Sequence, residues 1–244
     1  MKKIAAIILA AGEGKRMNSN VVNKVILKLG SKPMILHAIE LLESLKISPI
    51  IVVVGFAKKS VIDILKKRVV YAHQKKRLGT ADAVKSALKY LPENINDVLV
   101  LNGDDSAFYK KETIEELINT HWKRKPSVTF LTIEADNPSG LGRVVRNDNG
   151  ELFGIVEDKD AILEYKSIKE INPGCYIFDL TFLKRYIGKI EKSSVSGEYY
   201  LTRLIDIAIK NNKKAEAVKA GSLVWRGINT LNELKEAEKI WKFI

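Results

Sequence analysis

The sequence has a single cysteine, only three histidines and no long apolar run. Because Cys175 stands alone, an internal disulfide and a zinc site built from several cysteines are excluded, which fits a reducing cytoplasm. His37, His73 and His121 lack the spacing of metal ligands. No segment approaches the roughly 18 apolar residues that a membrane span needs. We therefore expect a cytoplasmic protein without a membrane partner.

Internal repeats, low-complexity linkers and an obvious domain border are also missing. The 244 residues are 46% hydrophobic and 29% charged, so one large globular domain fits. Lysine and arginine number 41 against 29 acidic residues, and the net charge of +12 favours anionic partners. The basic runs at 66–68, 75–77 and 123–125 carry no interleaved aromatics and no nucleic-acid motif. They predict a solvated lysine-rich surface and no nucleic-acid partner.

The N-terminal segment, with Lys2 and Lys3 before an apolar run, imitates a secretory signal. The run is interrupted at Gly12 and Gly14, so a buried strand that enters a glycine turn explains these residues better. Short runs rich in isoleucine, leucine and valine predict buried strands at 4–10, 50–55 and 97–101. Helical spacing covers 34–46, 80–91 and 111–123. This alternation predicts a parallel sheet with right-handed crossovers.

After Pro126 the pattern changes to strands joined by turns. It predicts strands at 127–135 and 174–179, with a hairpin between them that turns at Asn149-Gly150. Residues 197–212 predict a helix with Leu201, Leu204, Ile205 and Ala208 turned inward, and another helix follows Thr230. We expect one α/β domain with a mixed sheet and an inserted lobe that faces the substrate.

Residues 9–17, LAAGEGKRM, form a glycine-rich segment at the carboxyl end of the first predicted strand. Gly12 and Gly14 allow close backbone approaches, and successive amides there can surround an anion. Arg16 supplies a planar cation suited to phosphate oxygens. The segment is neither a P-loop nor a dinucleotide fingerprint, because Met17 stands where the last glycine belongs. An ordinary strand–turn–helix joint with a surface arginine is the alternative.

Four further residues have a physical interpretation of their own. Lys24 could reach a phosphate bound in the glycine loop, although a surface lysine is the alternative. Gln74 carries a donor and an acceptor, which can meet the edge of a pyrimidine. Thr80 is suited to cap the next helix, and capping alone would explain it. Asp104 ends an apolar strand where open sheets hold ligands, and its carboxylate suits Mg²⁺ or merely caps a turn.

The glycine-rich segment resembles the G-x-G-x-R-M signature of sugar-phosphate nucleotidylyltransferases. Further matching segments follow in order at 74–84, 99–105, 140–146, 154–161, 170–174, 197–202 and 226–229. Together they look like the uridylyltransferase domain of the bacterial bifunctional enzymes that make UDP-N-acetylglucosamine, over nearly the whole chain. The resemblance implies the nucleotide-diphospho-sugar transferase type of fold. That fold is Rossmann-like, with a mixed, mostly parallel sheet, helices on both faces and a small sugar-binding β lobe.

The resemblance also implies a set of site residues. It assigns catalysis to Arg16 and Lys24, and the cofactor Mg²⁺ to Asp104 and Asn229. The nucleotide-binding residues that it implies are Leu9, Ala10, Ala11, Gly12, Gly14, Gln74, Gly79, Thr80, Asn102 and Gly103. The sugar-binding residues that it implies are Gly142, Glu157 and Asn172. A carboxylate and a carboxamide are apt partners for sugar hydroxyls and an N-acetyl group.

The activity that the resemblance implies is Mg²⁺-dependent transfer of a uridylyl group from UTP to N-acetylglucosamine 1-phosphate, with pyrophosphate as the second product. Another sugar 1-phosphate, or a cytidylyltransferase of the same fold, is the alternative within the enzyme class. A non-catalytic sensor of sugar nucleotides is the alternative outside it. The presence of Arg16, Lys24, Asp104 and Asn229 together argues against a sensor, because binding alone would not need all four.

The expected organisation is a single nucleotidyltransferase domain over 1–244. Its nucleotide-binding half covers 1–125, its sugar-binding half 126–229 and its C-terminal helix 230–244. The hexapeptide repeats of a β-helix acetyltransferase domain are not found, so neither that activity nor the trimer it builds is expected.

Several positions depart from the family pattern. Lys15 replaces the threonine that is common in the family, Asn23 replaces the usual proline, and Leu141 replaces the usual tyrosine. Residues 105–107 replace Val-Pro-Leu, Arg203 replaces an aspartate and Arg226 replaces a glutamate. These changes leave the transfer chemistry intact and bear on the choice of sugar and the arrangement of the metal.

Overall fold

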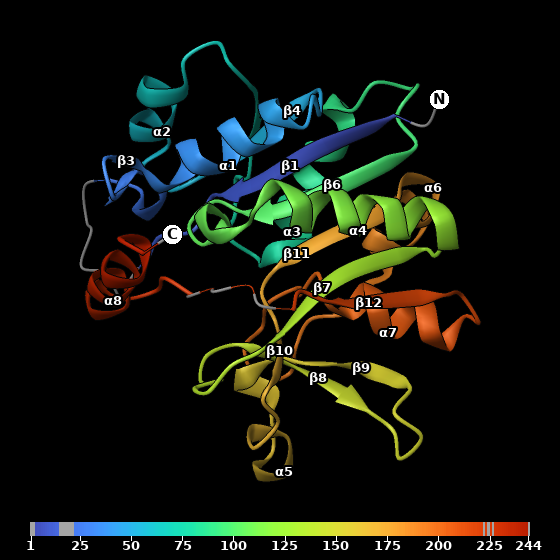
Figure 1. Ribbon diagram of the computed structural model, residues 1–244. Helices are drawn as coiled ribbons and strands as arrows, with labels where there is room; N and C mark the ends of the chain where they lie inside the picture. Colours follow the sequence, from blue (N-terminus) through green and yellow to red (C-terminus); the bar gives the residue numbers. More distant parts are fainter. Residues whose placement is uncertain (1–2, 15–21, 222, 224, 226, 244) are drawn as a thin grey trace.

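The computed structural model describes residues 3–14, 22–221, 223, 225 and 227–243. Within them one sheet of ten strands runs through the molecule in the order β5-β4-β1-β6-β11-β7-β10-β8-β9, with β12 beside β7 (Figure 1). The predicted mixed sheet is confirmed.

The first half of the chain forms the parallel part of the sheet. β1 (Ile4–Ala10) lies between β4 (Ile50–Val54) and β6 (Asp97–Asn102), and β5 (Val70–His73) pairs with β4, all in parallel. The three central strands are almost entirely apolar because helices cover both of their faces. The three strands predicted here are confirmed to within one residue.

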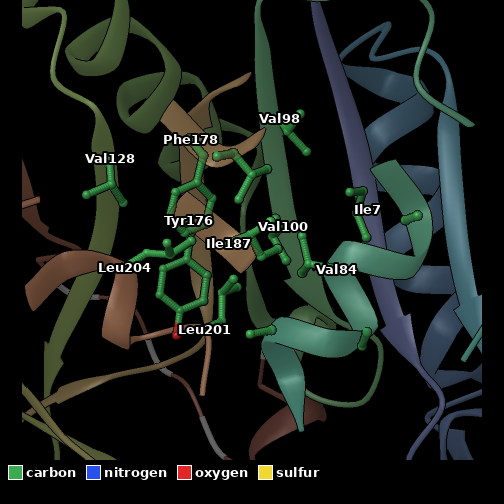
Figure 2. Packing of buried hydrophobic residues seen from close by; sticks show 14 of the residues in the cluster. Ile7, Val84, Val98, Val100, Val128, Tyr176, Phe178, Ile187, Leu201 and Leu204 are labelled. Carbon is green, nitrogen blue, oxygen red and sulfur yellow. The ribbon is translucent and has the colours of Figure 1, made fainter. Parts of the chain in front are cut away.

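Helices cover the sheet on both faces, and alternate residues of each strand pack against opposite layers. The helices on one face are α1 (Met34–Ser44), α2 (Lys58–Leu65) and α4 (Lys111–Arg124). Those on the other are α3 (Thr80–Ala87), α6 (Leu180–Tyr186) and α7 (Arg203–Lys210). Ile7 contributes to the second layer and Ile8 to the first. Figure 2 shows the second layer, where Val84 and Leu204 pack with Ile7 and Tyr176.

The second half of the chain extends the sheet and adds a lobe. β11 (Cys175–Asp179) pairs antiparallel with β6 and with β7 (Val128–Glu134), and β12 (Ala215–Lys219) runs parallel to β7. The lobe, at the bottom of Figure 1, consists of β8 (Gly142–Arg146), β9 (Leu152–Val156), β10 (Glu170–Asn172) and α5 (Leu163–Lys166). The predicted hairpin is confirmed, and Gly150 has the positive φ of +77° that its turn requires.

Two predicted helices differ from the structure. The one expected at 197–212 begins only at Arg203, because the backbone of Tyr199 bonds to Leu78 and Ala81 instead of to its own helix. Its predicted inward residues are nevertheless buried. The helix expected at 80–91 ends its α-helical part at Ala87 and continues as a 3₁₀ turn, Leu88–Tyr90.

The last helix, α8 (Leu231–Trp241), is confirmed where it was expected, with Thr230 as its N-cap. It packs beside the short hairpin of β2 (Lys28–Leu29) and β3 (Lys32–Pro33), where Leu29 and Ala237 share a small apolar cluster. This contact holds the segment before α8 close to the end of β6. None of the helices in the described part of the chain combines the length and apolarity needed to cross a membrane.

Candidate active site

A cavity of about 1030 Å³ opens at the carboxyl ends of β1, β4, β5 and β6, with the lobe as its opposite wall. Open α/β sheets hold their ligands at this edge. The predicted site residues that line the cavity are Leu9, Ala11, Gly12, Gly14, Lys24, Gln74, Gly79, Thr80, Asn102, Asp104, Gly142, Glu157, Asn172 and Asn229. Arg16 lies outside the described residues. The segments chosen from the sequence therefore converge on one cavity.

Ala10 and Gly103 stand behind the cavity wall and do not line it. The side chain of Ala10 is buried in the core, and its carbonyl oxygen accepts a hydrogen bond from Asn23 Nδ2 at 2.9 Å. The Gly103 amide donates to the Leu9 carbonyl oxygen at 3.0 Å, and a Cβ on Gly103 would come within 3.0 Å of that oxygen. Both residues support the strand ends, while their contact with a nucleotide stays a prediction.

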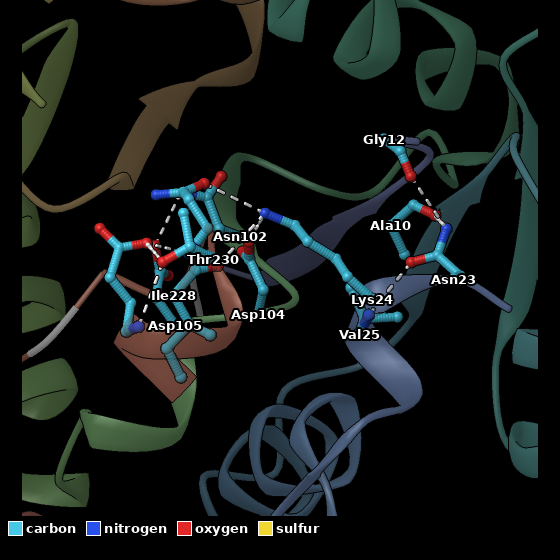
Figure 3. A network of polar contacts seen from close by, with 12 residues as sticks. Ala10, Gly12, Asn23, Lys24, Val25, Asn102, Asp104, Asp105, Ile228 and Thr230 are labelled. Atoms are coloured by element: carbon cyan, nitrogen blue, oxygen red, sulfur yellow. Dashed lines mark hydrogen bonds and ion pairs between the residues drawn. The ribbon is translucent and has the colours of Figure 1, made fainter. Parts of the chain in front are cut away.

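Asn23 fastens the glycine loop to the neighbouring strand ends (Figure 3). Its Nδ2 donates to the carbonyl oxygens of Ala10 and Phe56 at 2.9 Å and of Gly12 at 3.2 Å. Its Oδ1 accepts from the Val25 amide at 3.1 Å, and only 1% of the residue is exposed. A buried carboxamide with this many partners fixes both the loop and the turn that follows it.

The Lys24 ammonium points towards Asp104 (Figure 3) and also contacts Asn229. Its Nζ forms an ion pair with Asp104 Oδ2 and lies 3.3 Å from Asn229 Oδ1 and 3.4 Å from the Ile228 carbonyl oxygen. These residues come from the turn after the glycine loop, the end of β6 and the segment before α8. Three oxygens therefore converge on one cation position at the cavity wall.

The oxygens at this position suit Mg²⁺, which takes one or two protein oxygens and fills its other positions with phosphate and water oxygens. Asp104 offers a carboxylate and Asn229 a carboxamide. Next to them Asp105 has a buried oxygen, Oδ1, without a hydrogen-bond partner. Burial and the neighbouring Asp104 charge raise the pKa of Asp105 well above its usual range. The described residues contain no cluster of three or more acidic, histidine or cysteine ligands.

The predicted base pocket is organised around Gln74, which is 7% exposed. Its Nε2 donates to the Gly79 carbonyl oxygen at 3.0 Å and to Asp82 Oδ2 at 2.8 Å. Gly79 has a φ of +115°, and a Cβ there would collide with the backbone of Tyr199. Only glycine fits this close approach. The carbonyl of Gly79 is thereby held in place beside Gln74.

The prediction that Thr80 caps the helix is wrong. Gly79 precedes the first helical residue of α3, and the helix has no side-chain cap. The Thr80 hydroxyl oxygen instead accepts a hydrogen bond from the Leu201 amide at 2.9 Å. The hydroxyl is used between two distant segments, because the segment before α7 lies directly against the start of α3. Thr80 still lines the cavity.

The lobe presents Glu157 and Asn172 to the cavity. Glu157 Oε1 accepts a hydrogen bond from the Thr202 hydroxyl at 2.7 Å, and burial raises the pKa of this carboxyl group. Asn172 donates through Nδ2 to the Tyr176 hydroxyl oxygen. A Cβ on Gly142 would lie 3.1 Å from Ile155 Cγ2, which is a tight contact, and 3.7 Å from Glu157 Oε2. The wall therefore carries a carboxylate and a carboxamide whose orientations are set by neighbours.

Asn23, Asp82 and Thr202 position site groups and were not chosen from the sequence as site residues. Asn23 was noted only as a departure from the family pattern. A small polar residue beside a glycine loop signals a local hydrogen bond, but its partners here lie on two segments, the glycine loop and the chain at Phe56. Asp82 is an acidic residue in a first helical turn, where an interaction with the helix dipole explains it equally well.

The remaining departures fall into three groups. Asp105 and Leu141 line the cavity. Arg203 forms ion pairs with Asp160 at 3.0 Å and Asp206 at 3.3 Å. Lys15 and Arg226 lie outside the described residues.

Comparison with known proteins identifies the family. The nucleotidyl transferase family matches residues 5–242. This chain belongs to the nucleotidyl transferase family. The prediction that it is a nucleotidyltransferase is thereby confirmed. The glycine loop, Lys24 and Asp104 line one cavity of this nucleotidyltransferase.

Curated relatives and a solved structure agree with this assignment. The chain is 42% identical to the bifunctional protein GlmU of Thermoanaerobacter pseudethanolicus over 99% of this chain and 52% of that protein. It is 40% identical to GlmU of Geobacillus sp. over 99% of this chain and 52% of that protein. This chain therefore spans about half the length of these relatives. The solved structure of a putative glucose-1-phosphate thymidylyltransferase from Bacillus anthracis shares the fold, with a TM-score of 0.80 and 24% sequence identity. The match covers 99% of this chain and 96% of that chain.

Proposed function

We propose that this nucleotidyltransferase transfers a uridylyl group from UTP to N-acetylglucosamine 1-phosphate, with release of pyrophosphate. The observation that carries the proposal is the single cavity in which Lys24, Asp104 and Asn229 meet between a base pocket and the lobe. Gln74 lies on the side of the parallel strands, and Glu157 and Asn172 lie on the lobe side. The relatives named GlmU support this choice of substrates.

The reaction asks the protein to position and neutralise charge. A phosphate oxygen of the sugar phosphate attacks the α-phosphorus of UTP, the bond to the bridging oxygen of the β-phosphate breaks, and pyrophosphate leaves. The attacking oxygen is already ionised at neutral pH, so no general base is needed. This agrees with a cavity whose lining includes no histidine or cysteine among the described residues. Alignment of the two substrates and electrostatic stabilisation of the transition state then account for the rate acceleration.

The residues of the chain have distinct roles in this proposal. The backbone around Gly12 and Gly14 surrounds the triphosphate, and Asn23 keeps that backbone in place. The Lys24 ammonium balances negative charge on the phosphates, together with Arg16 as the resemblance implies. Glu157 accepts hydrogen bonds from the sugar, and Asn172 donates a hydrogen bond to it. Asn23, Glu157 and Asn172 are each held by hydrogen bonds to their neighbours, so these three side chains are already oriented before the transfer.

Mg²⁺ would supply charge neutralisation for the phosphate oxygens when bound. Asp104 and Asn229 would hold it, because their oxygens already share one cation, the Lys24 ammonium. Lys24 is long enough and flexible enough to pair with a phosphate instead.

The test is a measurement of pyrophosphate release from every pairing of UTP, CTP and dTTP with N-acetylglucosamine 1-phosphate, glucosamine 1-phosphate and glucose 1-phosphate. The highest kcat/KM is expected for UTP with N-acetylglucosamine 1-phosphate, and chelation of divalent cations should abolish it. A higher kcat/KM for another pairing would replace the proposed substrates. Binding of UDP-N-acetylglucosamine without any pyrophosphate release would identify a sensor.

A further inference from the structure

Gln74 and Asp82 form a contact that the transfer reaction does not use. Asp82 lies in the first turn of α3, and Asp82 Oδ2 accepts a hydrogen bond from Gln74 Nε2 at 2.8 Å. Gln74 lines the cavity, whereas Asp82 does not. The hydrogen bond to Gln74 therefore connects Asp82 to the cavity.

The contact determines which end of the Gln74 carboxamide faces which neighbour. A carboxamide can be turned by 180° with little change of shape, so its orientation depends on the donors and acceptors around it. Here Nε2 lies against the Gly79 carbonyl oxygen at 3.0 Å and against a carboxylate oxygen of Asp82. Both neighbours only accept hydrogen bonds. The reversed orientation would place Oε1 against two acceptors, so only the observed one is compatible with this environment.

The fixed orientation leaves Oε1 as the polar atom that Gln74 offers to a ligand. Among the described residues no hydrogen bond occupies Oε1, and the residue retains 7% exposure at the cavity. Oε1 accepts hydrogen bonds and cannot donate one. It can pair with a base that presents an N–H at this edge. Uracil and thymine have such a group at N3, whereas N3 of cytosine is an acceptor and its N–H donor is the neighbouring N4 amino group. A base seated with N3 at Oε1 is therefore favoured when it is uracil or thymine.

We propose that Asp82 is a positioning residue that makes the site select bases with an N3–H, uracil or thymine, over cytosine. The inference rests on the proposed function, because it takes Gln74 to face the base of the nucleotide. Asp82 acts by holding the carboxamide of Gln74 with its oxygen towards the ligand. The carboxylate form matters, because a carboxylate has no hydrogen to donate to Oε1 of a reversed Gln74.

An interaction of Asp82 with the dipole of α3 is the ordinary explanation for an acidic residue in a first turn. That role would affect the stability of α3 and would change the affinities for all nucleotides together. The proposed role changes the ratio of two affinities. Glu112 supplies a matched control, because it is also acidic, lies in the first turn of α4 and is exposed.

The experiment compares equilibrium affinities for UTP, dTTP and CTP by calorimetry, with Mg²⁺ and without sugar phosphate, so that no transfer is needed. The key variant is Asp82→Asn, whose amide can donate to Oε1 of a reversed Gln74, so that only the Gly79 carbonyl oxygen still disfavours that orientation. We expect the preference for UTP over CTP to fall on the order of 10-fold, the size of one hydrogen bond at a base edge. The ratio of UTP to dTTP should not change, and Glu112→Ala should change neither ratio.

The outcomes separate this inference from the proposed function. If the unaltered protein prefers UTP and Asp82→Asn keeps the whole preference, or loses affinity for all three nucleotides equally, the positioning role of Asp82 is refuted. If the unaltered protein does not prefer UTP over CTP, the proposed substrate is wrong before any variant is considered. Asp82→Ala is the second variant should Asp82→Asn fail to fold. It removes one of the two acceptors, and a smaller loss of preference is expected.

Discussion

Single buried side chains determine the shape of the cavity beside the glycine loop. Asn23 is the clearest case, because one carboxamide satisfies three backbone oxygens that belong to the glycine loop and to the strand beside it. Its family counterpart, a proline, would lack the amide that here donates to the Ser60 hydroxyl at 3.1 Å. This chain therefore stabilises its glycine loop with a side chain.

Replacement of Asn23 by alanine should lower the free energy of unfolding by about 1–3 kcal/mol, since buried carbonyl oxygens lose their donors. The measurement is urea-induced unfolding followed by circular dichroism. Asn94→Ala, at an exposed position, serves as the control and should change stability little. Equal stability of Asn23→Ala and the unaltered protein would show that water replaces the carboxamide without cost.

The charge of Asp104 is expected to matter for turnover more than for folding. Asp104→Asn keeps the size of the side chain but removes the charge that faces Lys24. We expect turnover to fall on the order of 100-fold or more at limiting Mg²⁺, with the unfolding transition nearly unchanged. Normal turnover at limiting Mg²⁺ would show that Asp104 does not hold the metal.

Glu157 should make stability depend on pH. Burial raises its pKa above the usual value of 4.5, so the folded protein holds this proton more tightly than the unfolded chain does. The resulting stabilisation is present at low pH and is lost as the pH rises above about 4.5 through the raised pKa. Glu157→Gln should therefore gain stability relative to the unaltered protein between about pH 4 and pH 7. Urea unfolding across that range tests this, and a constant difference between the two proteins would contradict it.

Among the helices, α8 has a direct connection to the site. Glu233, at the third position of the helix, accepts a hydrogen bond from the Asn229 amide at 2.7 Å, and its own amide donates to the Thr230 hydroxyl at 3.1 Å. This is a variant of the capping box in which Glu233 binds the amide of Asn229, one residue before the N-cap Thr230, and it fixes the backbone from which Asn229 reaches towards Lys24.

Loss of this cap should reduce the apparent affinity for Mg²⁺ without unfolding the domain. We expect Glu233→Ala to raise the Mg²⁺ concentration for half-maximal activity several-fold, because the Asn229 carbonyl oxygen is less well placed. Glu238→Ala, at an exposed position of the same helix, should leave the Mg²⁺ dependence unchanged. The same Mg²⁺ dependence in all three proteins would mean that Asn229 is positioned without the cap.

The structural elements were predictable where local sequence and tertiary environment agree. β1, β4 and β6 are apolar throughout because they are buried on both faces, and an apolar run alone reveals them. β12 was not predicted, since its pattern at Ala215–Lys219 mixes polar and small residues and its pairing with β7 is long-range. The start of α7 was misplaced because Tyr199 bonds to Leu78 and Ala81, far away in sequence.

For the whole molecule, the continuous sheet explains why distant motifs meet. β11 lies between β6 and β7, so the chain returns to the centre of the sheet after building the lobe, and both walls of the cavity belong to one framework. Motif order predicted which segments line this cavity. The hydrogen bonds that orient them were not predictable, because Asp82 with Gln74, and Thr202 with Glu157, become neighbours only in the folded chain.

The central claim is that this cavity joins UTP to N-acetylglucosamine 1-phosphate. The most direct test incubates the protein with both substrates, Mg²⁺ and UTP labelled at the α-phosphate, and identifies the labelled product by chromatography and mass spectrometry. The account predicts that the label appears in UDP-N-acetylglucosamine, with one pyrophosphate released for each molecule formed. Label that remains in UTP, or that enters a different sugar nucleotide preferentially when sugar phosphates compete, would contradict it.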